Sequence, residues 1–416
     1  MRKYIKELVK RAKENSYKLN RIDSSLKDAA LFRMADCLLE NKAFILEENR
    51  KDVELALKNK LQKSLIDRLT LNEKRINEMS ESLKEIAKLP DPIGKVINGW
   101  TRPNGLSLKK IRTPIGVILI IYEARPNVTS DCVGLLFKSS NVAILRGGSD
   151  SMHSNKAISV VLKKAVKESG IDFEPFFVVE KSDHKIVDLL LKENEYIDLV
   201  IPRGGEALIQ KVVKNSTIPV IKHYKGVCHI FIDNDIDMLK TLRICVNAKV
   251  QRPSVCNAVE KILVHKDIAK AFLPQLKNEF DKYKVEIRGD DKTYKILKGI
   301  KKAKYQDWFA EYLDLIIAIK VVTDIEEAIS HINFYGSHHT DSIITKNSAN
   351  AAKFIKEVDS ACCFVNISTR FSDGYQFGLG AEIGISTDKL HARGPMGLEE
   401  LTTYKWMVQG DGQIRE

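Results

Sequence analysis

The chain has 416 residues, of which 44% are apolar and 29% charged, so it is not a disordered protein. Because a single hydrophobic core stops growing at roughly 250–300 residues, the length predicts two or three domains. No apolar run approaches the ~20 residues of a membrane-spanning helix. The N-terminus has no signal-peptide core. We therefore expect a cytoplasmic protein with no membrane partner.

The formal net charge of +12 draws attention to anionic partners. The lysines are scattered along predicted helices and pair with glutamates, as Lys3 does with Glu7. There is no basic arm, zinc finger or RNA-binding aromatic signature, so we expect no nucleic acid partner. The charge has two remaining interpretations: a diffuse field that attracts small polyanions, and a surface merely solvated by lysine.

The seven cysteines are an odd number, with neither the spacing of a disulfide framework nor that of a zinc site. This pattern fits a reducing compartment and predicts no bound metal.

Residues 1 to about 90 are predicted to be helical. Apolar residues between Ala30 and Leu39 follow the spacing of a helix with one buried face. Ser24 or Ser25 is the predicted cap of that helix.

Residues 96–113 predict a β-hairpin around the turn Asn104-Gly105. The polar tail at 398–416 is strand-capable and can pair with this hairpin. We expect the two segments to form an arm that joins subunits into a homodimer or a larger homo-oligomer.

After Pro114, continuous apolar strands alternate with helices, which predicts parallel sheets covered on both faces. The expected strands are 115–121, 141–146, 176–179 and 196–201 in a first region, and 228–232, 259–264, 315–322, 342–345 and 363–366 in a second. The predicted class is α/β, with a Rossmann-like cofactor-binding domain (1–95 and 114–225), an α/β catalytic domain (226–390) and a β arm (96–113 and 391–416). No G-x-G-x-x-G follows any strand.

Cys256 is the candidate nucleophile. A helix is predicted to end near Lys249, the step Arg252-Pro253 breaks it, and a strand resumes at Val259, so the thiol lies on a loop between regular elements. Arg252, or Lys249, is near enough in sequence to favour the reactive thiolate. The other cysteines of the α/β regions lie in apolar runs and are predicted to be core: Cys132, Cys228, Cys245, Cys362 and Cys363.

Two glycine pairs follow strands and open helices, at Arg146-Gly147-Gly148-Ser149 and at Arg203-Gly204-Gly205. Their backbone N–H groups can bind phosphate or ribose oxygens, although a Gly-Gly pair is often only a turn. Asn127, which follows the first strand, has two interpretations. It is either a cap or turn residue, or an amide that donates to an oxyanion.

Five segments together resemble the gamma-glutamyl phosphate reductases, a family of the aldehyde dehydrogenase superfamily: 116–129, 144–155, 251–257, 371–386 and 389–405. The resemblance runs in order along the whole chain. It implies an aldehyde-dehydrogenase-like fold and an oxidoreductase that uses NADPH. The implied reaction converts gamma-glutamyl phosphate, received from glutamate 5-kinase, into glutamate 5-semialdehyde for proline biosynthesis.

The same resemblance assigns roles to residues. Cys256 matches the nucleophile, Asn127 the oxyanion-hole amide that acts with the Cys256 N–H, and Glu311 the carboxylate that holds the nicotinamide ribose. Arg146 is placed where it meets the 2′-phosphate of NADP. Gly147, Gly148 and Ser149 belong to the same cofactor turn, and Gly204 and Gly205 are expected beside the pyrophosphate.

The chain departs from hydrolytic members of the superfamily at 220–229, which contains no general-base glutamate. A thioester that is reduced rather than hydrolysed needs no such base. His223 in this stretch either assists proton transfer, contacts phosphate or is structural. The candidates for binding the substrate are Arg125, His223, Asn366, Ser368 and Glu382, each of which also has a structural interpretation.

Two alternatives remain open from the sequence. One is another acylating dehydrogenase of the superfamily that depends on phosphate or coenzyme A. The other is a non-catalytic scaffold or nucleic-acid-binding relative, which the presence of Cys256, Asn127 and Glu311 together argues against.

Overall fold

The computed structural model describes residues 1–123, 125–181, 183, 185–222 and 224–415, apart from the side chain of Ser64. The chain forms two compact units. Unit 1 comprises Met1–Lys222, Gly378–Gly384 and Met396–Glu416, and unit 2 comprises His223–Phe377 and Ile385–Pro395. The first change of unit lies within three residues of the predicted boundary. The return of 378–384 to unit 1 was not predicted.

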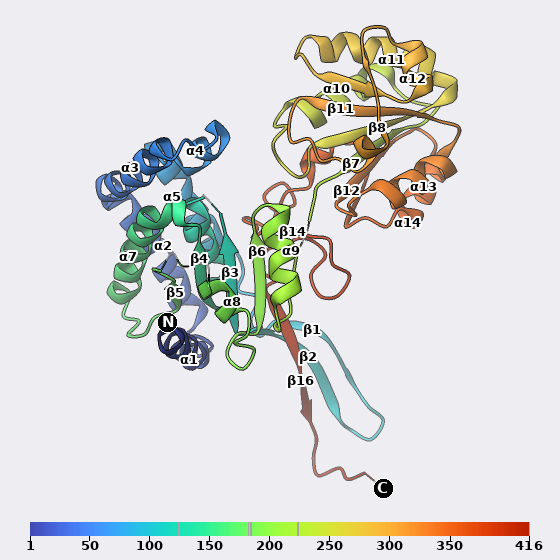
Figure 1. The fold of residues 1–416 in the computed structure, drawn as a ribbon. Helices are drawn as coiled ribbons and strands as arrows, with labels where there is room; N and C mark the ends of the chain where they lie inside the picture. The colour runs from blue at the N-terminus through green and yellow to red at the C-terminus, as the bar shows by residue number, and fades with distance from the viewer. Residues whose placement is uncertain (124, 182, 184, 223, 416) are drawn as a thin grey trace. The chain divides into compact units, whose positions relative to one another are not determined.

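The N-terminal helices of unit 1 follow the predicted helical region. They are α1 (Arg2–Leu19), α2 (Ser24–Glu40), α3 (Lys42–Lys58), α4 (Lys63–Leu69) and α5 (Glu73–Lys88) (Figure 1). The apolar stripe of α2 is buried as expected, from Ala30 to Leu38. The predicted serine cap is wrong. Asp23 precedes the helix, and both Ser24 and Ser25 lie inside its first turn.

The sheet of unit 1 contains four parallel strands in the order β5-β4-β3-β6: β3 (Val117–Tyr122), β4 (Val142–Gly147), β5 (Phe176–Val178) and β6 (Leu199–Arg203). The intervening helices are α6 (Asn127–Lys138), α7 (Met152–Glu168), α8 (Lys185–Leu190) and α9 (Glu206–Asn215). All six residues of β3 are buried. The chain adds β4 and β5 on one side of β3 and β6 on the other. The strand order therefore reverses beside β3, which is where open α/β sheets bind ligands.

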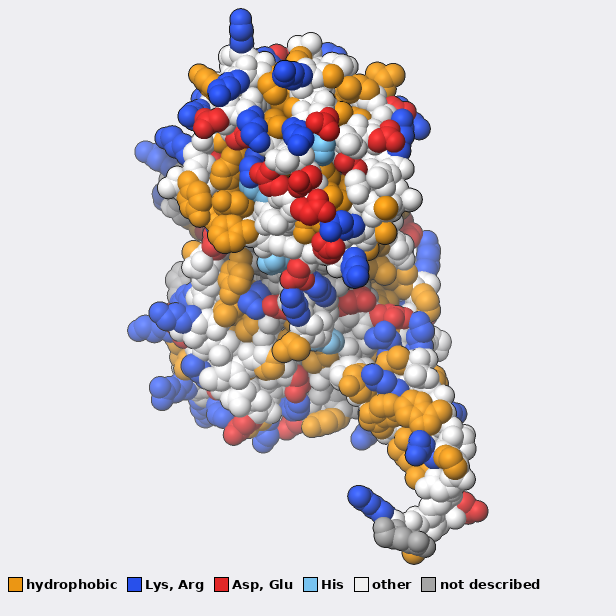
Figure 2. All heavy atoms as spheres, turned by 90° about the vertical axis from the view of Figure 1, so that its right-hand side faces the viewer, with side chains coloured by type: hydrophobic (Ala, Val, Ile, Leu, Met, Phe, Trp, Pro, Cys, Tyr) orange, Lys and Arg blue, Asp and Glu red, His pale blue; other side chains and the backbone are white. Residues whose placement is uncertain are grey.

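A three-stranded antiparallel arm belongs to the same unit and consists of β1 (Val96–Thr101), β2 (Ser107–Pro114) and β16 (Thr402–Gln409). The tail pairs with the hairpin, as the sequence predicted. Hydrophobic side chains remain exposed along the arm, and Figure 2 shows orange spheres on it at the lower right of the view. They include Val96, Ile97, Trp100, Trp406, Met407 and Val408.

Unit 2 is built on a seven-stranded sheet in the order β10-β9-β11-β8-β7-β12-β13, all of whose neighbours pair in parallel. Its strands are β7 (Cys228–Ile232), β8 (Val259–His265), β9 (Glu286–Gly289), β10 (Lys301–Lys302), β11 (Ile316–Val322), β12 (Thr340–Ile344) and β13 (Cys362–Val365). Its helices are α10 (Met238–Val250), α11 (Lys266–Asp281), α12 (Asp291–Ile296), α13 (Ile325–Tyr335) and α14 (Ser348–Glu357).

Five strands of unit 2 match the predicted ones, whereas β10, at the edge of the sheet, and its neighbour β9 were not predicted. Two residue clusters form the core around the sheet, one of them centred on α10, α11 and the strands β8 and β11. A short antiparallel pair, β14 (Ile385–Ser386) with β15 (Gly394–Pro395), completes unit 2. Among the described residues, no helix is both long and apolar enough to span a membrane.

Candidate active site

Cys256 lies on the loop between α10 and β8, as predicted, and is half-buried. The loop is fixed from beneath by the start of β7. The Cys228 thiol donates to the Cys256 carbonyl oxygen at 3.2 Å, and the backbone of Gly226 lies against the same carbonyl. Neither the thiol nor the amide N–H of Cys256 is hydrogen-bonded to any residue that the structure describes. Both groups can therefore meet a substrate.

Gly226 also connects the cysteine loop to Glu311. The Gly226 N–H donates to Glu311 Oε1 at 2.9 Å, so one glycine lies against both the Cys256 loop and Glu311. A Cβ at position 226 would lie 1.9 Å from the Cys256 carbonyl oxygen, so no other residue fits there without displacing the loop. Gly226 was not predicted, because a single glycine before a strand is not a motif.

Buried charges hold the segment that carries Glu311. Lys261 Nζ donates to the Ala310 carbonyl oxygen at 2.6 Å, and Glu260 Oε1 accepts from the Leu313 N–H at 3.3 Å. Burial lowers the pKa of Lys261 to about 7, against the opposing attraction of Glu260. These contacts fix the backbone on both sides of Glu311.

The predicted role of Lys249 beside the thiol is wrong, because its ammonium is fully buried in an ion pair with Glu260 at 3.1 Å. Arg370, on the loop after β13, interacts electrostatically with Cys256. Burial and the nearby Arg252 lower the pKa of Arg370, while Asp373 and Cys256 oppose that shift. Positive charge next to a thiol favours its thiolate.

Arg370 also ties its own loop to the cysteine loop. Its guanidinium donates to Gln251 Oε1 at 2.8 Å and to Asn257 Oδ1, and the Asn257 amide donates to the Ser372 carbonyl oxygen at 2.8 Å. Both acceptors of Arg370 are neutral amides, so its charge is not cancelled by direct contact with a carboxylate.

The remaining cysteines match the core prediction with one exception. Cys37, Cys132, Cys228, Cys245 and Cys362 are buried, whereas Cys363 is only half-buried. Burial raises the pKa of the Cys363 thiol to about 11, which leaves it unreactive at neutral pH.

In unit 1, the glycine turns end β4 and β6 next to the point where the strand order reverses. A Cβ on Gly147 would lie 2.1 Å from Asn155 Nδ2, and one on Gly204 would lie 2.6 Å from Glu123 Oε2. Gly204, Gly205 and Ser149 are exposed. Open α/β sheets bind nucleotides where the strand order reverses, and these exposed glycine turns lie at that edge, so a nicotinamide cofactor fits this edge of the sheet.

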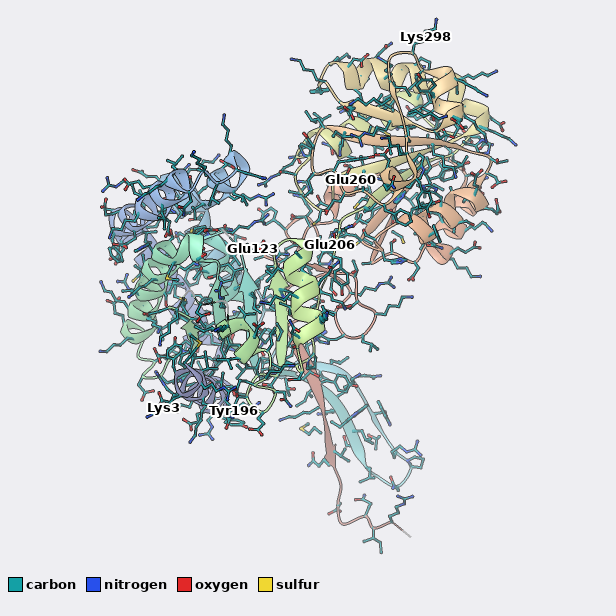
Figure 3. The ribbon with its side chains drawn as sticks, in the orientation of Figure 1. Lys3, Glu123, Tyr196, Glu206, Glu260 and Lys298 are labelled. Atoms are coloured by element: carbon teal, nitrogen blue, oxygen red, sulfur yellow. The ribbon has the colours of Figure 1, made fainter. Side chains whose placement is uncertain are left out.

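Some of the N–H groups predicted for phosphate already bind carboxylates of the protein. Gly205 N–H donates to Glu123 Oε2 at 2.9 Å, and Figure 3 shows Glu123 near the start of α9, where Glu206 lies. Asp52 accepts the N–H groups of His153 and Ser154 at the start of α7, at 3.1 and 2.8 Å. Both helices therefore begin against an anionic side chain.

Arg146 is buried at the end of β4, and its Nη1 donates to the Gly147 carbonyl oxygen at 2.7 Å. Desolvation lowers its pKa, while Tyr122 opposes that shift. The side chain thus shapes the turn that contains Gly147 and Gly148 and places a positive charge within it.

Asn127 is the first residue of α6 and is exposed. Its amide donates to Asp131 Oδ2 at 3.2 Å, and Ser82 Oγ donates to Asp131 Oδ1 at 3.1 Å. Burial raises the pKa of Asp131 to about 6, which the bonds from Ser82 and Asn127 partly offset. Since an amide nitrogen carries two hydrogens, Asn127 keeps a second donor for an oxyanion.

The candidate substrate residues differ in what they already bind. Both polar atoms of the Asn366 amide are hydrogen-bonded to the backbone of Thr345. Oδ1 accepts from the Thr345 N–H and Nδ2 donates to the Thr345 carbonyl oxygen, both at 2.9 Å. Ser368 is buried and caps a short 3-10 turn. Arg125 is exposed after β3 and Glu382 is half-buried, both in unit 1. His223 lies outside the described residues.

Within the described residues, no group of three His, Cys, Asp or Glu side chains could hold a metal ion.

Comparisons with known proteins show the family to which the chain belongs. The model of the aldehyde dehydrogenase family matches residues 2–313. A gamma-glutamyl phosphate reductase from Sulfurihydrogenibium sp. (strain YO3AOP1) is 52% identical over 423 aligned residues, which cover 100% of this chain and 95% of the relative.

Solved structures give the same result. The crystal structure of a gamma-glutamyl phosphate reductase from Thermotoga maritima superposes with a TM-score of 0.97 at 48% identity, covering 99% of this chain and 100% of the other. A glyceraldehyde-3-phosphate dehydrogenase from Methanocaldococcus jannaschii, complexed with NADP, shares the fold at a TM-score of 0.69 and 16% identity, with 99% and 95% of the two chains covered. The chain therefore belongs to the gamma-glutamyl phosphate reductase family of the aldehyde dehydrogenase superfamily, whose members are nicotinamide-dependent oxidoreductases.

Proposed function

We propose that the protein reduces L-gamma-glutamyl 5-phosphate to L-glutamate 5-semialdehyde and phosphate with NADPH, in proline biosynthesis and in the cytoplasm. The observation that carries the proposal is Cys256, a half-buried thiol on a fixed loop beside Arg370, in a chain about half identical to named gamma-glutamyl phosphate reductases. The bound cofactor supplies the hydride for the reduction.

The chemistry on the protein begins with the Cys256 thiolate. Its sulfur attacks the acyl carbon, the bond from that carbon to the phosphate oxygen breaks, and phosphate leaves with the electron pair. The product is a thioester on Cys256. Once hydride has been added to the thioester carbon, the carbon–sulfur bond breaks, releasing the aldehyde and restoring the thiolate without a further proton.

Both tetrahedral stages place a negative charge on the former carbonyl oxygen. We assign its stabilisation to the amide N–H of Cys256 and to the second N–H of Asn127. The bond from Asn127 to Asp131 holds the amide nitrogen, rather than its oxygen, toward the helix, and this fixes the orientation of the remaining donor. A pre-oriented donor of this kind lowers the barrier by ~3–4 kcal/mol.

The segment between α9 and β7 explains why the thioester would not be hydrolysed. Residues 220–229 include no aspartate or glutamate, so the stretch offers no carboxylate to activate water. The thioester then persists until it is reduced.

For the cofactor, we assign the turns at Gly147-Gly148-Ser149 and Gly204-Gly205, the charge of Arg146 and the carboxylate of Glu311. A Cβ atom on Gly147 or Gly204 would collide with Asn155 or Glu123, so both turns require glycine at these positions. Arg146 brings a cation to the first turn, which favours the additional 2′-phosphate of NADPH over NADH. Glu311 is held by Gly226 and accepts hydrogen bonds, as binding a ribose hydroxyl requires.

We further propose that the arm joins two or more copies of the chain and that the substrate comes from a kinase that phosphorylates glutamate. Assembly is supported by Trp100 and Trp406, which are exposed on a sheet that nothing in the chain's described residues covers. Their ring centroids lie 5.4 Å apart. Light scattering at micromolar concentration should show an oligomer, and a monomer would contradict the proposal.

The reaction class can be tested in reverse. The protein should reduce NADP while oxidising glutamate 5-semialdehyde, and the rate should require inorganic phosphate. A rate that depends on coenzyme A, or one that proceeds in water without phosphate, would overturn the assignment.

A further inference from the structure

A pocket of about 640 Å³ opens in unit 2 beside the cysteine loop. One wall is a face of α10, where Lys240, Arg243 and Asn247 recur at helical spacing, and continues to Gln251 at the helix end. The opposite wall is the loop after β13, including Arg370. Two of the predicted substrate candidates, Asn366 and Ser368, also line this wall. Lys240, Arg243 and Arg370 were not predicted, because isolated cations on a helix or loop form no motif.

The charges around the pocket favour an anion. Its lining contains three cations, Lys240, Arg243 and Arg370, and one carboxylate, Asp373. Asp373 Oδ1 accepts the N–H groups of Tyr375 and Gln376 at 3.0 and 3.3 Å, so one of its two oxygens is engaged within its own turn, and the three cations still outnumber this carboxylate. Among the residues that the structure describes, Arg243 has no ion-pair partner.

The position of the pocket relative to the thiol indicates which part of the substrate it holds. Cys256 is not part of the lining, but Gln251 is, and Arg370 contacts both Gln251 and the residue after the cysteine, Asn257. The substrate's phosphate is bonded to the carbon that the thiol attacks and must lie at the thiol. A neighbouring pocket that excludes the thiol fits the opposite end of the molecule.

We propose that this pocket binds the α-carboxylate end of the substrate's amino acid moiety, with Arg243 and Arg370 as the cations that recognise it; the inference rests on the function proposed above. Guanidinium groups match the planar geometry of a carboxylate. The amides of Asn247 and Gln251 add polar groups, and Ile244 and Phe371 in the lining cover the methylene groups between the two ends. The pocket would thus select aldehydes and acyl phosphates that carry a carboxylate.

Arg243 is the residue to test, because Arg370 also links two loops and its removal would disturb Cys256. The matched substrates are glutamate 5-semialdehyde and 4-aminobutanal, which differ only by the α-carboxylate. In the phosphate-dependent reverse reaction, Arg243→Gln should raise the KM for glutamate 5-semialdehyde by at least ~10-fold. The KM values for 4-aminobutanal and for phosphate should stay unchanged. Arg243→Lys should recover part of the loss.

Lys298→Gln is the control for the loss of one positive charge, since Lys298 is exposed in unit 2, outside the pocket lining (Figure 3). An increase in the KM for phosphate alone would assign the pocket to phosphate and overturn the proposal, as would an unchanged KM for the semialdehyde.

Calorimetry with L-glutamate and 4-aminobutanoate separates this proposal from the proposed function, because it needs no turnover. Arg243→Gln should weaken the binding of glutamate and not of 4-aminobutanoate, even in a protein without phosphate-dependent activity. Equal glutamate binding by the wild type and Arg243→Gln would refute the pocket assignment whatever the reaction is.

Discussion

The backbone of Gly226 lies directly against that of Cys256, and a Cβ at position 226 would lie 1.9 Å from the Cys256 carbonyl oxygen. Gly226→Ala must therefore displace the cysteine loop. Because misplacing a reacting group by about 1 Å can cost ~10²-fold in rate, we expect turnover to fall by at least that factor. Single-turnover kinetics on folded protein measure the effect.

Gly170→Ala is the control for backbone strain alone. Gly170 has φ +84° and open space around its Cβ position, so its substitution should cost ~1–2 kcal/mol of stability and leave turnover intact. If Gly226→Ala loses only stability in the same way, the glycine does not position the thiol.

The oxyanion role of Asn127 makes a second prediction. Asn127→Ala should lower the rate of the chemical step by ~10²–10³-fold, while NADPH affinity barely changes. A residue that only supports the start of α6 would instead show a loss of ~1 kcal/mol in stability with near-normal turnover. Single-turnover rates and thermal melting distinguish the two, and a stable variant that turns over at the wild-type rate would end the assignment.

Asp131 should make the protein's stability depend on pH. Its pKa of about 6 lies above the ordinary value of an aspartate, so the folded state binds more protons than the unfolded state between about pH 4 and 6. The contribution of Asp131 is therefore fully present below about pH 4 and is lost as the pH rises to 6. Asp131→Asn should be more stable than the wild type above pH 6, by at most ~3 kcal/mol.

Melting curves of the wild type and of Asp131→Asn between pH 4.5 and 8 check this linkage. The stability difference should grow with rising pH and level off above pH 6. A difference that is constant over this range would contradict the raised pKa, and a change in kcat that follows the same titration would link Asp131 to the orientation of Asn127.

Arg146 should set part of the cofactor preference. The wild type should use NADPH with a higher kcat/KM than NADH. A buried charge is screened less than an exposed one, so removing it with Arg146→Ala should lower kcat/KM for NADPH more than for NADH. Steady-state kinetics with both cofactors test this prediction. If Arg146→Ala leaves the ratio of kcat/KM for NADPH to that for NADH unchanged, Arg146 only shapes its turn.

The parts of the fold that were predictable are those encoded by local patterns. The continuous apolar runs gave the central strands β3, β4, β7 and β8, and the Asn104-Gly105 turn gave the arm hairpin. Strand β9 was missed because Glu286 and Arg288 interrupt its short apolar pattern, and it is paired mainly with β11. Its position depends on neighbours that are distant in sequence.

The candidate site shows the same division. The loop context identified Cys256, since Arg252-Pro253 separates a helix from a strand within the sequence itself. The contacts of Gly226 with Cys256, and of Glu123 with Gly205, join residues 30 and 82 positions apart along the chain, and no local pattern encodes them. Proximity in sequence was misleading for Lys249, which is near Cys256 along the chain but forms a buried ion pair with Glu260.

The most direct test of the account is to look for the thioester on Cys256. Wild-type protein incubated with glutamate 5-semialdehyde and NADP in the absence of phosphate should accumulate an acyl group, which peptide mass mapping should locate on Cys256. Adding phosphate should discharge it. Cys256→Ser should fold, bind NADPH and carry no thioester, while Cys363→Ser, at the other half-buried thiol, should react normally. Phosphate-dependent turnover by Cys256→Ser, or an acyl group on another residue, would contradict the mechanism.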